Sequence, residues 1–120
     1  MRLAPRLLAL ALVAALAGCA VDIPDINARP SKYYEHKVTF TGRIARTQVL
    51  ADSTLLEVAD SRGHRILVRS TAPVEQSTGD WVKVTGVLVP EARAGDTTLY
   101  DVVVAERIVR TRAPRFANLM

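Results

Sequence analysis

Two stretches of this 120-residue chain share one pattern: VTFTGRI at residues 38–44 and VKVTGVL at residues 82–88. Each alternates apolar and polar side chains, which predicts a strand with one face buried in a core. Each also carries a glycine at its fifth position, although glycine weakens a strand interior and usually marks a sharp bend or a close backbone approach. Two strands that both bend sharply indicate a small, strongly curved sheet.

The rest of the chain continues the period of two. Five short strands are expected, around residues 37–44, 56–58, 66–68, 82–88 and 99–109. In the last strand, Val102, Val104 and Ile108 are expected to face the core. Residues 60–63 (DSRG) predict a hairpin turn, whereas residues 71–80 and 90–98 each contain proline and glycine and predict loops. Short strands separated by turns predict an all-β domain, either a closed barrel or a small sandwich.

Three blocks of this pattern resemble the OB-fold family. They are V-x-F-x-G-x-I at residues 38–44, a strand–turn–strand unit around Gly63 at residues 56–68, and D-x-V-x-V-x-G-x-L at residues 80–88. The resemblance implies that residues 37–110 form a small five-stranded Greek-key barrel, in which the two glycines clear space. One departure is the link at residues 71–80, which is short and interrupted by Pro73 where many OB domains have a helix. Because this fold hosts many functions, the activity stays open.

The N-terminus predicts export and a lipid anchor. Two arginines without an acidic residue (MRLAPR) precede eleven apolar residues, a signal-like run too short to prefer a spanning helix. LAGC at residues 16–19 resembles the lipobox of bacterial lipoproteins. The resemblance implies cleavage before Cys19, acylation of this only cysteine, and attachment to a bilayer. Ala20 then points to the outer membrane, with the domain facing the periplasm.

These features divide the chain into four parts: a signal peptide at residues 1–18, a lipidated cysteine and tether at 19–36, the OB-fold at 37–110 and a flexible basic tail at 111–120. The apolar side chains of the tether are expected to pack against the base of the domain; they are Ile23, Ile26, Tyr33 and Tyr34.

The sequence offers little catalytic chemistry. His36 and His64 show no metal-ligand spacing, so neither a metal nor another cofactor is expected. Asp60, Ser61 and His64 lie too close together on one hairpin to adopt the geometry of a catalytic triad, and a turn stabilised by side-chain hydrogen bonds is the simpler interpretation. We therefore expect a non-catalytic protein.

A binding surface remains. OB-folds commonly bind along the outer face of the second and third strands, between two flanking loops. By alternation this face would present Leu55, Glu57, Arg65, Leu67 and Arg69, with Arg43 beside it and Arg93 in a flanking loop. The alternative is a solvated face whose charges discourage edge-to-edge aggregation.

The charge and the aromatic content of the chain limit the classes of ligand that we expect. The formal charge of +4 falls to +2 without Arg2 and Arg6 of the signal, because 14 basic and 12 acidic residues remain. The predicted face also lacks the aromatic side chains on which single-stranded nucleic acid stacks. We therefore expect an envelope module that binds or scaffolds another envelope protein or an anionic glycan or polymer; a membrane-anchored nucleic-acid-binding protein is the alternative.

Overall fold

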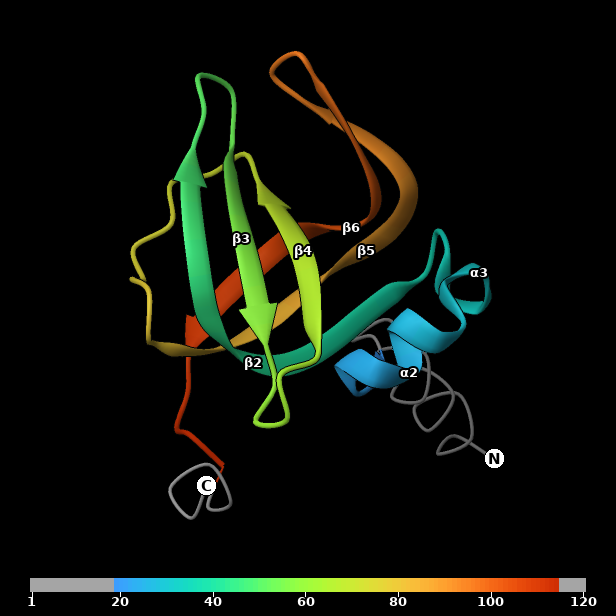
Figure 1. Cartoon of the computed structure of the whole chain (residues 1–120), viewed down its shortest axis with the longest axis vertical. Helices are drawn as coiled ribbons and strands as arrows, with labels where there is room; N and C mark the ends of the chain where they lie inside the picture. Colours follow the sequence, from blue (N-terminus) through green and yellow to red (C-terminus); the bar gives the residue numbers. More distant parts are fainter. Residues whose placement is uncertain (1–18, 115–120) are drawn as a thin grey trace, which may run out of the picture.

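The computed structural model describes residues 19–114, so the predicted signal peptide and the last six residues of the predicted tail lie outside the described residues. The elements follow the order β1 (Cys19–Ala20), α2 (Ile23–Ala28), α3 (Pro30–Tyr33), β2 (Lys37–Val49), β3 (Thr54–Ala59), β4 (Arg65–Ser70), β5 (Trp81–Ala94) and β6 (Thr97–Arg110) (Figure 1). Within residues 19–114, neither helix has the length and apolar character needed to cross a bilayer.

Five strands close into a barrel in the order β2–β3–β4–β6–β5, and β5 returns to pair with β2. The β4–β6 pairing is parallel and the other four are antiparallel. The short strand β1 adds to β2 in parallel, where β3 no longer pairs with it. The predicted all-β, five-stranded Greek-key barrel is therefore confirmed.

Alternate residues of the strands fill the barrel. Val38, Phe40 and Ile44 of β2 are all buried, as the period of two predicts. The other strands contribute aliphatic side chains to the same core: Leu56, Val58, Ile66, Val68, Val82, Val84, Leu88 and Val103. Each such side chain stabilises the fold by about 1.5–3 kcal/mol relative to an exposed one.

The two glycines allow close contact between strands. A Cβ atom on Gly42 would lie 2.5 Å from Val58 Cγ1 and 2.8 Å from the Ala59 carbonyl oxygen. A Cβ atom on Gly86 would overlap the backbone of Val104 and lie 2.9 Å from Val103 Cγ1. The prediction that both glycines clear space in a curved barrel is confirmed.

A β-bulge next to Gly86 changes which side chains of β6 face the core. Thr85 pairs with Arg107 but Gly86 pairs with Ala105, which leaves Glu106 as an extra residue. Val103, opposite Leu88, therefore joins the barrel core. The expectation for this strand is partly right: Val102 is fully buried and Ile108 packs against the core, but Val104 is only half-buried, because simple alternation does not allow for the extra residue.

The prediction of a loop at residues 90–98 is wrong. β5 and β6 continue as a long hairpin that ends in the two-residue turn Gly95–Asp96, at the top of Figure 1. Gly95 has φ +61°, which suits the first position of a type II′ turn. Pro90 does not end the strand, because the ladder omits it and resumes at Glu91. β2 likewise runs past residue 44, with a bulge between Ile44 and Arg46.

The segment expected to be a tether is part of the folded domain. Ile23 and Ile26 of α2 are each 1% exposed and belong to the barrel core, while Tyr33 and Tyr34 pack against it, as predicted. The Asn27 side-chain amide donates a hydrogen bond to the Arg65 carbonyl oxygen (2.8 Å), and α2 lies against the lower end of β4 in Figure 1. The barrel end is thus filled from the N-terminal side, and the link at residues 71–80 contains no helix.

Candidate functional site

The predicted binding face lies on β3 and β4. Leu55 is opposite Arg69 and Glu57 is opposite Leu67, so the structure brings these residues together as expected. Leu55, however, is only 9% exposed, and the expectation that it forms part of an open face is wrong. Its neighbours across the sheet are Gln48 and Arg69, close to the point where two loops meet.

These two loops are the β2–β3 turn and the tip of the β5–β6 hairpin. The Gly95 backbone N–H donates to both carboxylate oxygens of Asp52 at 3.3 Å, and the Ser53 hydroxyl donates to the same carboxylate at 3.1 Å. The Gly95 N–H, and then the Ser53 hydroxyl, hold the pKa of Asp52 below its ordinary value. Since Ala94 and Ser53 are buried at this contact, the loops that flank the predicted face are joined at one end.

Most charges of the predicted face are already paired. Arg65 forms an ion pair with Glu57, and Arg69 Nη2 lies 3.7 Å from the Asp52 carboxylate. The Arg69 side chain is only 18% exposed, and its Nε atom is buried without a hydrogen-bond partner among the described residues. The predicted face therefore offers an anionic ligand little free positive charge.

The other two predicted residues lie away from this centre. Arg43 of β2 is exposed between Ala59 of β3 and Trp81 of β5. Arg93 is exposed on the β5–β6 hairpin, opposite Thr98. The structure does not bring either residue into the β3–β4 cluster.

The Asp60 and His64 pair forms a turn rather than a catalytic arrangement. Asp60 accepts hydrogen bonds from the backbone N–H groups of Arg62 and His64, and its carboxylate lies 2.9 Å from His64 Nδ1. Burial raises the pKa of Asp60, but the hydrogen bonds from His64 and Arg62 outweigh it and hold the pKa below its ordinary value. Across residues 19–114, no three His, Cys, Asp or Glu side chains gather in a way that could hold a metal ion.

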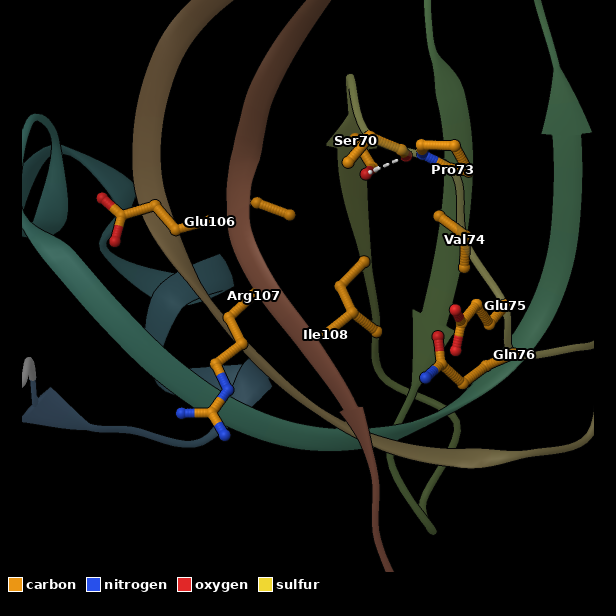
Figure 2. Close-up of a pocket in the computed structure, with 10 residues that line it drawn as sticks. Ser70, Pro73, Val74, Glu75, Gln76, Glu106, Arg107 and Ile108 are labelled. Carbon is orange, nitrogen blue, oxygen red and sulfur yellow. Dashed lines mark hydrogen bonds between the residues drawn. The ribbon is translucent and has the colours of Figure 1, made fainter.

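A groove of about 260 Å³ lies between β6 and the link that follows β4 (Figure 2). It exists because β4 pairs with β6 only from Leu67 to Arg69, so the later part of β6 faces the link instead. Val74 and Ile108 point towards each other across it, and the Ser70 hydroxyl donates to the Ala72 carbonyl oxygen at 2.7 Å. Its charged side chains, Glu75, Glu106 and Arg107, have mixed signs and do not converge.

A more distinctive site occurs on the outer face of β2, β5 and β6. A hollow of about 240 Å³, which we call the basic hollow, is lined by Thr39, Lys83, Thr85, Arg107 and Val109. Arg107 extends from β6 across β5 towards β2, on the side away from Val74 and Ile108 (Figure 2). Neither Lys83 nor Arg107 forms an ion pair with a carboxylate of residues 19–114.

The sequence did not reveal the basic hollow. Lys83 and Thr85 occupy polar positions of the second glycine pattern, which was a usable signal. Alternation in the last expected strand, with Ile108 facing the core, also places Arg107 on the outer face. The sequence does not give the register between the two strands, which puts Arg107 opposite Thr85.

Comparison with known proteins shows the fold but no family. No protein-family model and no curated protein matches the sequence. Telomere capping protein Ten1 from Saccharomyces pombe superimposes with a TM-score of 0.56 at 14% identity, over 83% of this chain and 87% of that one. Replication protein A of U. maydis, bound to ssDNA, gives a TM-score of 0.54 at 15% identity, over 79% and 73% of the two chains. This domain is an OB-fold.

Larger proteins contain similar domains. A putative aspartyl-tRNA synthetase from Leishmania major Friedlin matches with a TM-score of 0.61 at 10% identity, over 82% of this chain. This chain spans about a fifth of the length of the tRNA synthetases that it matches (21%). At such low identity the likeness concerns the fold alone.

Proposed function

We propose that this protein is a non-catalytic lipoprotein of the bacterial cell envelope, in which an acylated Cys19 holds an OB-fold binding module on the periplasmic side of the outer membrane. The observation that carries the proposal is the lipobox-like LAGC at residues 16–19, which follows a cationic start and a short apolar run. Cleavage before Cys19, as the lipobox implies, would place the lipid on a residue that pairs with Val38 of β2.

Energy considerations assign separate roles to the lipid and to the charges. Acyl carbons contribute about 0.8 kcal/mol per buried CH₂, so two or three long chains hold the protein in a bilayer without help. A basic side chain near anionic lipid contributes only about 1 kcal/mol. The lipid would therefore attach the domain, and its surface charges would orient it and select a ligand.

The basic hollow supports an anionic ligand for this module. It combines two cations that have no ion-pair partner among the described residues with two threonine hydroxyl groups. The β3–β4 face, in contrast, has its arginines paired with Glu57 and Asp52. We propose an anionic envelope polymer or an acidic surface of another envelope protein as the ligand class.

Metabolic labelling with palmitate tests the anchor. We expect the wild-type protein and an Ala20→Ser control to incorporate label and to sediment with membranes. A Cys19→Ser variant should lose the label, because the acylated thiol is removed. Equal labelling of Cys19→Ser and wild type would refute the proposal.

The alternative is a membrane-anchored nucleic-acid-binding protein. Two observations favour it: the fold is similar to that of an ssDNA-bound replication protein A, and the barrel has unpaired cations on its outer face. Binding to a fluorescent single-stranded oligonucleotide, with heparin as the competitor, decides between the two. Binding that is tighter to the oligonucleotide than to heparin and falls steeply with salt would favour this alternative, and no binding would eliminate it.

A further inference from the structure

The lipid attachment point is rigidly joined to the barrel. Cys19 is opposite Val38, Ala20 is opposite Thr39, and the Val21 N–H donates to the Thr39 carbonyl oxygen at 2.9 Å. α2 follows almost at once and is fixed by the buried Ile23 and Ile26. A lipid on Cys19 would therefore be joined to the folded domain without a flexible tether. Such a domain must rest on the bilayer surface with a restricted choice of faces.

One row of residues leads from this attachment point into the basic hollow. Ala20 pairs with Thr39, Thr39 with Thr85, and Thr85 with Arg107, across four neighbouring strands. Neighbouring strands are about 4.8 Å apart, so Arg107 lies about 15 Å along the sheet from Ala20, and Thr39 about 5 Å. The hollow thus begins one strand away from the residue next to the lipid.

The chemistry of the hollow suits a phosphate group. Lys83 is opposite Val109, which makes Arg107 its diagonal neighbour on the same face, and an anion between the two cations would relieve their repulsion. The hydroxyl groups of Thr39 and Thr85 lie 3.1 Å apart, so one donates to the other. The second hydroxyl hydrogen stays free to donate to a ligand oxygen. No aromatic side chain lines the hollow, which gives stacked bases no platform.

We infer that the basic hollow binds the phosphate of an anionic phospholipid in the leaflet that holds the anchor. This inference rests on the proposed acylation of Cys19, and for the basic hollow it replaces the polymer or protein ligand proposed above with a lipid headgroup. The binding turns the outer face of β2, β5 and β6 towards the bilayer. It leaves the β5–β6 hairpin and the β3–β4 face free for other contacts.

Trp81, the only tryptophan, is a built-in reporter of this orientation. It precedes Lys83 by two residues on β5 and therefore belongs to the same face of the strand. The lipidated protein is reconstituted into phosphatidylcholine vesicles with or without about one-third phosphatidylglycerol, each with a spin-labelled headgroup lipid that quenches nearby tryptophan. We expect stronger quenching with phosphatidylglycerol, and a loss of that difference in high salt.

Two matched double variants identify the residues. Lys83→Gln with Arg107→Gln should reduce the quenching in phosphatidylglycerol vesicles by about twofold or more, because both cations of the hollow are removed. Arg46→Gln with Arg93→Gln removes two exposed cations that line neither the basic hollow nor the surroundings of Trp81, and it should leave the quenching unchanged. If the wild type and the Lys83/Arg107 double variant float with the vesicles and are quenched equally, the inference about the basic hollow is refuted while the proposed function stands. Protein that lacks acyl chains and does not float would overturn both the inference and the proposed function.

Discussion

The attachment of α2 to the barrel can be measured through one isoleucine. Ile26 is 1% exposed and lies in the core, so Ile26→Ala removes three carbon atoms from a packed interior. Such truncations cost about 2–5 kcal/mol, from lost transfer free energy and from the cavity that remains. A small domain has about 5–15 kcal/mol of stability in total, so this single change should remove a large fraction of it.

Urea unfolding followed by the fluorescence of Trp81 provides the assay. Trp81 lines a hollow together with Ile23 and Pro24, so its emission reports on α2 as well as on the barrel. Val49→Ala is the matched control, because Val49 is 77% exposed on β2 and its truncation should change the stability by no more than about 0.5 kcal/mol. If Ile26→Ala also cost less than about 1 kcal/mol, α2 would be a loosely attached tether, and the argument for a rigid anchor would fail.

Two other perturbations address the barrel and its joined loops. Gly86→Val should lower the melting temperature far more than Thr85→Val, since the new Cβ overlaps the backbone of Val104 whereas the Thr85 change loses only one hydroxyl contact; similar thermal shifts would contradict the role of Gly86. Asp52→Ala should accelerate hydrogen exchange of the Gly95 amide, with Asp96→Ala as the control, because the Asp52 carboxylate accepts that N–H. In the wild type the folded pKa of Asp52 is below the ordinary value of 3.8. The stabilising contact is therefore complete well above pH 3.8 and is lost as the pH falls through the lower folded pKa. If the Gly95 amide showed no added opening below pH 3.8, the stabilising role of the Asp52 carboxylate would be refuted.

The fold could be predicted from the sequence because its main determinants are local. Alternation in residues 38–44 and 82–88 assigns buried and exposed faces, and the turn at residues 60–63 joins two strands of a hairpin. Local signals failed where a long-range contact stabilises the chain. Residues 90–98 have a loop-like composition, yet pairing between β5 and β6 extends the strands to Ala94 and Thr97.

The candidate site could be predicted from the sequence much less well than the fold. Alternation correctly placed Leu55 and Arg69 on one face, but it contained no information about the hairpin tip that meets Asp52 beside them. It also gave no register between β5 and β6, so it could not show that Lys83 and Arg107 are diagonal neighbours. Prediction of a surface needs the register of every strand that contributes to it, and a single inserted residue reverses the faces.

The sequence by itself determined the alternating strands, the glycines at the points of closest approach and the hairpin turn, because each depends on the conformational preferences of a few adjacent residues. Only the tertiary structure decided that residues 20–36 close the barrel end, that two loops join through Asp52 and Gly95, and that two cations and two hydroxyl groups meet outside β5. These arrangements depend on contacts between distant segments, which form only after the strands have closed into a barrel.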